Sequence, residues 1–171
     1  TTHQELIHVF GNGIRGLNQP KTVLNAENSG TTMRLLAGLL SGQPFKSVID
    51  GDLSLRTRPM KRIIEPLSKM GAEINGTNDN SLPPISILGG DLKGIKYSPK
   101  VASAQVKSCL LIAGLFAQGK TELYNLQPSR DHTERMLKAM GADIVIEKTN
   151  ITVQPSPLNA KDVLVPGDIS A

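Results

Sequence analysis

The sequence has little cysteine and few aromatic residues, and each shortage excludes a class of protein. Cys109 is the only cysteine among 171 residues, so neither an intrachain disulfide framework nor a cysteine zinc cluster can form. A single thiol is typical of a reducing compartment, and we predict a cytoplasmic location. Aromatic residues make up 3% of the chain, with no tryptophan, so few rings are available to stack on bases. Binding of single-stranded nucleic acid is therefore disfavoured.

Long hydrophobic runs and a strong charge imbalance are missing as well. The longest apolar run, 109–117, is shorter than the roughly 20 residues that cross a bilayer. The first residues, TTHQELIHVF, lack the cationic and apolar regions of a signal peptide, so we expect no membrane partner. Lys and Arg total 19 against 15 Asp and Glu, a net charge of +4. This mild basic bias suits small phosphorylated ligands without requiring a nucleic acid.

The clearest pattern that is present is an internal repeat. Segments starting at Gly38 and Gly114 both read as the end of a helix, a strand, a polar turn, a helix, Met-Gly-Ala and a strand. Gly71 and Gly141 stand where a glycine ends a helix before a strand. We predict an α+β fold of repeated βαβαββ units in a single domain, 1–171. It contains a partial unit 1–24 and repeat units 25–90 and 91–160.

Hydrophobic periodicity predicts the elements of these units. The predicted helices are 31–40, 59–70, 104–117 and 131–140. The predicted strands are 6–10, 47–50, 72–75, 85–88, 121–126, 143–147 and 151–154, the last two forming a hairpin. Helices 31–40 and 104–117 are the most apolar, so we expect them at the buried centre with the sheets outside.

Single residues predict where these helices begin and where one of them is irregular. Ser29 and Ser103 are predicted N-caps, and Asp131 with Glu134 has the spacing of a capping box. Pro66 should bend or loosen helix 59–70, because proline removes a backbone donor.

Two features, a glycine pattern and the histidines, do not indicate a cofactor or metal site. Gly11, Gly13 and Gly16 match GxGxxG, but Pro20 follows and no helix begins, so we interpret 11–16 as a turn-rich hairpin end. The histidines have no metal-ligand spacing; they are His3, His8 and His132. We expect no metal and no cofactor.

The helix starts are more informative. Asn28 to Thr31 places small polar residues around Gly30, and Arg34 follows one turn inside the helix. Helix 104–117 begins similarly, and arginines precede the other two helices: Arg56, Arg58 and Arg130. Capping explains the serines, whereas an arginine before a helix start opposes the helix dipole and favours a bound anion. The alternative is scattered, solvated surface charge.

Several strings carry a resemblance to a known family. They are NSGTTMRLLAG, GDLSLRTRPMKRIIEPLSKMGAEI, VASAQVKSCLLIAGLFAQGKT, PSRDHTERMLKAMGA and VPGDIS. In this order, over nearly the whole chain, they resemble the enolpyruvyl transferase family, most closely the branch that uses shikimate-3-phosphate. The branch that uses UDP-N-acetylglucosamine is an alternative, but it carries a cysteine in the segment corresponding to 51–58, where this chain has none. A non-catalytic phosphate- or RNA-binding module of the same repeat is a second alternative, disfavoured by the few aromatics.

The resemblance implies transfer of the enolpyruvyl group from phosphoenolpyruvate to shikimate-3-phosphate with release of phosphate, and no cofactor. It implies two similar domains, each an α-β prism with buried central helices. Residues 161–171 would cross over to the second domain. The acid and base of the family lie on that domain, so we expect no catalytic residue here and a substrate-binding half that is inactive alone.

The resemblance also assigns binding residues. Ser103, Ala104, Gln105 and Arg130 match the family's contacts to shikimate-3-phosphate. Gly30, Arg58 and, again, Gln105 match its contacts to phosphoenolpyruvate. Arg34 and Lys107 are possible additional cations of the site.

Overall fold

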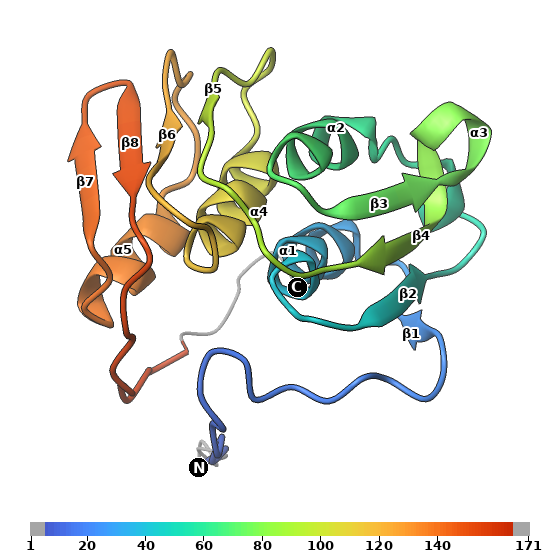
Figure 1. Ribbon diagram of the computed structural model, residues 1–171, viewed down its shortest axis with the longest axis horizontal. Coiled ribbons are helices and arrows are strands. Elements are labelled where there is room, and N and C mark those ends of the chain that lie inside the picture. The colour runs from blue at the N-terminus through green and yellow to red at the C-terminus, as the bar shows by residue number, and fades with distance from the viewer. Residues whose placement is uncertain (1–5, 166–171) are drawn as a thin grey trace, which may run out of the picture.

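The computed structural model describes residues 6–165 and contains two sheets with helices packed beside them (Figure 1). The remaining residues, 1–5 and 166–171, lie outside the described part. They include His3, the start of the predicted partial unit 1–24 and most of the predicted crossover 161–171. The fold is α+β, as the sequence predicts.

The first sheet has the strand order β1-β2-β4-β3. Strands β1 and β2 are parallel, whereas β4 runs antiparallel to both β2 and β3. The elements of this half are β1 (Leu24–Asn25), α1 (Gly30–Ser41), β2 (Lys46–Asp50), the 3-10 turn η1 (Leu55–Thr57), α2 (Lys61–Lys69), β3 (Glu73–Gly76), the single turn α3 (Thr77–Asn80) and β4 (Leu82–Leu88).

The second sheet repeats this topology, with the order β5-β6-β8-β7. Strands β5 and β6 are parallel, and β8 is antiparallel to β6 and β7. Its elements are β5 (Lys96–Tyr97), α4 (Ala104–Gly114), β6 (Thr121–Leu123), α5 (His132–Ala139), β7 (Ile144–Glu147) and β8 (Asn150–Val153). Both sheets are therefore mixed, and the predicted hairpin 143–154 is confirmed as β7 and β8.

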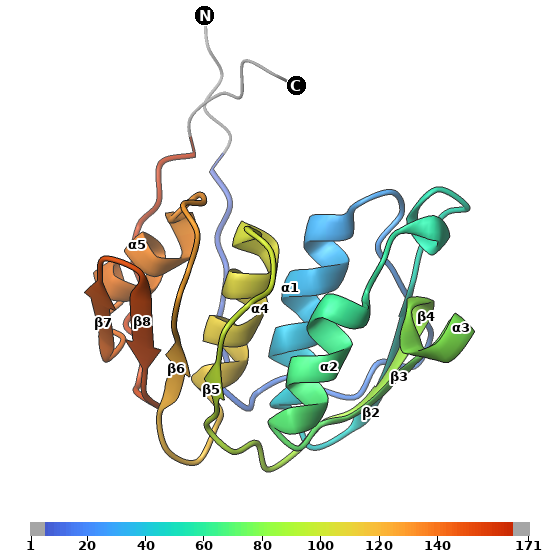
Figure 2. The same cartoon turned by 90° about the horizontal axis from the view of Figure 1, so that it is seen from above.

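Helices α1 and α4 pack closely against each other at the centre, with the sheets outside (Figure 2). A Cβ atom at Gly38 of α1 would lie 2.3 Å from the carbonyl oxygen of Cys109 in α4, so glycine permits this approach of the two backbones. Cys109, Leu110 and Leu111 are fully buried. The predicted burial of the most apolar helix is confirmed, although α4 ends at Gly114 and 115–117 continue as turns.

Several local predictions are wrong. Residues 6–10 form no strand, and Leu6 and Phe10 are 80% and 89% exposed, because no strand within residues 6–165 lies beside them to accept their hydrogen bonds. Residues 11–16 form no hairpin end; the backbone N–H of Gly16 donates to the Gly13 carbonyl in one turn. The predicted start of helix 59–70 moves to Lys61, and α2 continues through Pro66 to Lys69.

Candidate anion site at the helix starts

Helices α1, α2 and α4 lie side by side and begin at the same end of the molecule (Figure 2). Ser29 caps α1, since its Oγ accepts from the backbone N–H of Thr32 at 3.1 Å. Ser103 caps α4 by accepting from the N–H of Val106 at 3.3 Å. Both predicted N-caps are confirmed. The free N–H groups and the positive dipole ends of these helices face one region, which favours a negative ligand there.

A side-chain bridge joins the starts of α1 and α4. Arg34 donates from Nη1 to Oε1 of Gln105 at 2.5 Å and from Nη2 to the carbonyl of Pro59 at 3.2 Å. The Nε2 group of Gln105 donates to Oγ1 of Thr31 at 2.7 Å. The amide of Gln105 is therefore fixed at both ends, and three segments far apart in the sequence meet at Arg34.

Arg34 is a buried cation without an acidic partner. Its exposed fraction is 7%, and it forms no ion pair with any carboxylate of residues 6–165. Burial lowers the pKa of Arg34, and the nearby guanidinium groups of Arg62 and Arg58 lower it further. Its Nε has no hydrogen-bond partner in the described part of the chain. Because a buried charge is costly unless it is compensated, this cluster of cations favours an anion beside it.

Gly30 and Arg58 border the same cluster. Arg58 donates to Oδ1 of Asn28, whose amide in turn donates to Asp52 at 2.7 Å. A Cβ atom at Gly30 would lie 2.8 Å from Nη1 of Arg34 and 3.4 Å from Nη1 of Arg58. Glycine therefore keeps the space beside both guanidinium groups free.

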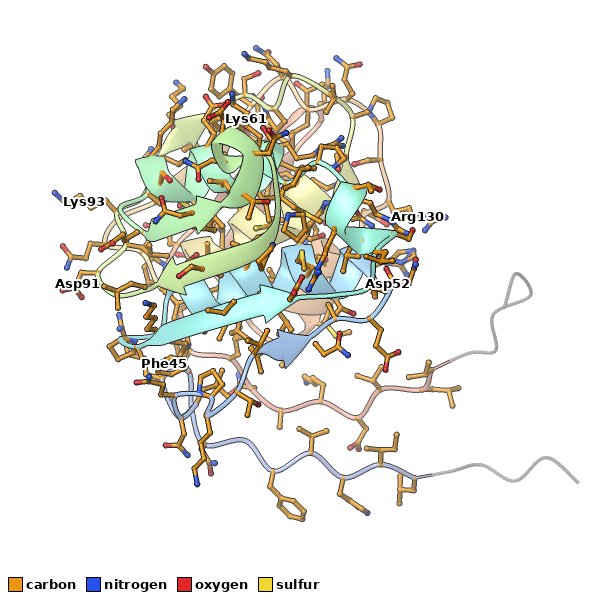
Figure 3. The ribbon with its side chains drawn as sticks, turned by 90° about the vertical axis from the view of Figure 1, so that its right-hand side faces the viewer. Phe45, Asp52, Lys61, Asp91, Lys93 and Arg130 are labelled. Carbon is orange, nitrogen blue, oxygen red and sulfur yellow. The ribbon has the colours of Figure 1, made fainter. Side chains whose placement is uncertain are left out.

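Arg130 is exposed, two residues before α5. It forms no hydrogen bond or ion pair with the described part of the chain. In Figure 3, Arg130 and Asp52 lie toward the same edge of the view. Asp52 accepts from the Asn28 side chain at the start of α1, whereas the guanidinium of Arg130 has no partner among residues 6–165 and is available to a ligand.

Two cations named from the sequence have carboxylate partners. The Nζ of Lys107 lies 2.5 Å from Oε1 of Glu134, with exposed side-chain fractions of 7% and 2%. Arg56 pairs with Asp50, and its hydrogen bond lowers the pKa of that carboxyl group. Glu134 is therefore used in this ion pair, and the predicted Asp131–Glu134 capping box is wrong, since Asp131 makes no side-chain cap bond.

One cation of the site is missing from the sequence prediction. Arg62 stands close enough to Arg34 to lower its pKa, and it follows Arg58 by four residues in the string RPMKR. Arg58 is extended and α2 begins at Lys61, so helical spacing does not relate the two arginines. The signal that could have identified Arg62 is a second arginine within the first turn of the predicted helix 59–70.

The helices of the described segment, 6–165, are all too short or too polar to cross a membrane.

Comparison with known proteins gives concordant results. The profile of EPSP synthase (3-phosphoshikimate 1-carboxyvinyltransferase) matches residues 2–171. The 3-phosphoshikimate 1-carboxyvinyltransferase of Syntrophomonas wolfei is 54% identical over 166 residues, which are 96% of this chain and 39% of that protein. Its counterpart in Thermodesulfovibrio yellowstonii is 51% identical over 173 residues, covering 100% of this chain and 40% of the relative.

A solved structure shares the fold. EPSP synthase from Acinetobacter baumannii superposes with a TM-score of 0.89 at 51% identity, over 94% of this chain and 36% of that one. The chain thus spans about two fifths of the length of the curated relatives it matches. With the profile matching almost every residue, the chain belongs to the EPSP synthase family.

Proposed function

We propose that the protein containing this chain transfers the enolpyruvyl group from phosphoenolpyruvate to shikimate-3-phosphate, and that this chain supplies binding residues for both substrates. The observation that carries the proposal is that Arg34, buried at the joined starts of α1 and α4, forms no ion pair with a carboxylate of residues 6–165. Both substrates are phosphorylated, and phosphoenolpyruvate also has a carboxylate. Guanidinium groups bind such anions with paired hydrogen bonds.

The assignment of residues follows the two helix starts. Shikimate-3-phosphate would bind Ser103, Ala104 and Gln105 at the start of α4, together with Arg130. Phosphoenolpyruvate would bind beside Gly30 and Arg58. The Arg34–Gln105 hydrogen bond supports a shared position for Gln105 between the two ligands.

The chemistry of this transfer depends on stabilising charge. The substrate hydroxyl adds to the phosphate-bearing carbon of phosphoenolpyruvate while the methylene carbon takes up a proton, which gives a tetrahedral ketal. Phosphate then leaves from that carbon and the new methyl group loses a proton, which restores the double bond. Fixed cations that compensate the phosphate and carboxylate charges in a site shielded from water contribute strongly to such a reaction. We assign no acid or base to residues 6–165, and we propose that these groups come from the rest of the protein.

The same proposal covers the larger architecture. We propose that 25–90 and 91–160 are two units of an α-β prism around α1 and α4, and that the prism is one of two domains. The identical strand order of the two sheets supports this arrangement. The buried free thiol of Cys109 is compatible with the predicted cytoplasmic location.

Two substitutions in the full-length protein test the assignment. Arg130→Ala should weaken shikimate-3-phosphate more than phosphoenolpyruvate, whereas Arg58→Ala should do the reverse. Each removes a charge-assisted contact worth about 1.5–3 kcal/mol, or tenfold or more in affinity. Isothermal titration with each ligand measures both effects, and Arg135→Ala serves as the control because it removes an exposed arginine from α5. Equal losses for both ligands in both variants would overturn the assignment.

A further inference from the structure

A buried ion pair joins the first turns of α4 and α5. The Nζ of Lys107 and Oε1 of Glu134 are 2.5 Å apart, and both side chains are more than nine-tenths buried. A second contact lies beside it in the sequence, a hydrogen bond of 2.7 Å between the hydroxyl groups of Ser108 and Thr133. The other carboxylate oxygen of Glu134 has no partner among the described residues. A buried pair with one oxygen unsatisfied costs desolvation energy, so stability alone gives little reason for it.

Helix α5 depends on few other contacts. Only Glu134 and Leu137 are buried among the residues of α5, His132–Ala139. A helix this short is not stable in water by itself and needs tertiary contacts. Leu137 supplies a non-directional apolar contact, whereas the ion pair has a defined geometry. The pair, with the Ser108–Thr133 hydrogen bond beside it, therefore fixes where the start of α5 lies relative to α4.

The start of α5 in turn sets the position of Arg130. Gln127 to Arg130 make no hydrogen bond or ion pair with the rest of residues 6–165. On the other side of the pair, the backbone N–H of Lys107 donates to the Ser103 carbonyl at 3.1 Å, so Lys107 belongs to the first turn of α4. The Lys107–Glu134 ion pair thus links the start of α4, which carries the proposed ligands, to the start of α5, which Arg130 precedes.

We propose that Lys107 and Glu134 are positioning residues for the shikimate-3-phosphate site, which hold Arg130 in register with Ser103 and Gln105. This inference rests on the proposed function. Neither side chain touches the substrate. Lys107 acts through Glu134 and the start of α5. The sequence predicts Lys107 as a possible additional cation of the site, and its role here is to position Arg130.

The test replaces the whole pair, since removing one partner would leave a buried charge. Lys107→Met/Glu134→Leu keeps the volume and removes the directional contact, and such exchanges are often neutral for stability. Lys69→Met/Glu65→Leu is the matched control, because that pair lies on α2 with exposed fractions of 56% and 44%. Lys107→Arg retains the charge and should preserve the register. Lys107→Leu/Glu134→Met, a second pair without charge, replaces the double variant if that one fails to fold.

The first measurement needs no ligand. Backbone ¹⁵N relaxation of this chain should show order parameters for 127–131 that fall from about 0.85 to below about 0.6 in the pair variant, with 103–105 and the thermal unfolding midpoint unchanged. The control and Lys107→Arg should match the unmodified chain. Order parameters for 127–131 that stay high in the pair variant would overturn the inference.

The second measurement is titration with shikimate-3-phosphate. The pair variant should bind about tenfold more weakly, the loss expected when one charge-assisted contact is misplaced. Affinity equal to that of the unmodified chain would also overturn the inference. Absence of binding by the unmodified chain would overturn the proposed function instead, and the relaxation data would then decide the role of the pair.

Discussion

At the scale of the residue, Gly30 shows how a missing side chain keeps space beside two cations. Its Cβ position is 2.8 Å from Nη1 of Arg34, the far end of a flexible side chain. We expect Gly30→Ala to leave the fold intact, displace that guanidinium and weaken phosphoenolpyruvate binding about tenfold in the full-length protein. Calorimetric titration measures the loss. Gly11→Ala is the control, because no described atom beyond its two chain neighbours lies within 4 Å of its Cβ position. An unchanged affinity in Gly30→Ala would contradict this account of the site.

Cys109 gives a pH-dependent prediction. Burial raises the pKa of its thiol from 9.0 to about 12, so the folded chain keeps the proton where the unfolded chain loses it. The stability that this protonation difference contributes is complete below pH 9 and is lost as the pH rises toward 12. Denaturant titrations between these limits should show an extra loss of about 1.4 kcal/mol per pH unit relative to Cys109→Ala. Parallel pH profiles of the two proteins would contradict the shift.

Residue-level prediction from the sequence succeeds where the partner is close in the chain. Ser29 and Ser103 cap their helices through a backbone N–H three residues ahead, so the local pattern is sufficient. The partner of Arg34 is 71 residues away, and no local pattern could identify it. Glu134 fails as a capping residue for the same reason, since a lysine on another helix binds its carboxylate.

At the scale of the element, the crossing of α1 and α4 depends on Gly38. A Cβ atom there would lie 2.3 Å from the Cys109 carbonyl, which is backbone and cannot move aside alone. Alanine in a helix is normally more favourable than glycine by about 0.5–1 kcal/mol. We nevertheless expect Gly38→Ala to destabilise the fold by about 2 kcal/mol or more, because the two helices must separate. Denaturant unfolding measures the change, with Gly30→Ala as the control on the same helix. A stabilised Gly38→Ala variant would refute this packing.

The elements also show when hydrophobic periodicity alone is enough to predict a helix or a strand. Helices 31–40 and 104–117 were predictable because their apolar residues have no place except the core. Residues 6–10 are as apolar as a strand but pair with no strand of residues 6–165. In contrast, β1 and β5 are two-residue strands, too short to show a pattern, that exist through pairing with β2 and β6. Pairing between distant segments, rather than propensity, decides these cases.

At the scale of the whole molecule, two halves of the same topology place their helix starts at one end. The repeat was predictable because each half carries its own glycine C-cap and strand pattern. The side-chain bridge between the halves was not, because it depends on how two units pack. The proposed function rests on that bridge and on Arg130. We therefore expect this chain to bind the substrates and the reaction to require the rest of the protein.

Titration of this chain with shikimate-3-phosphate, followed by the amide shifts, tests that claim most directly. We expect weak binding, since the half-site is open to water, with the largest shifts at 29–31, 103–105 and 129–131. Adding phosphoenolpyruvate should then release no phosphate. Shifts confined to 11–16 would contradict the location of the site, and turnover by this chain would contradict the division between recognition and chemistry.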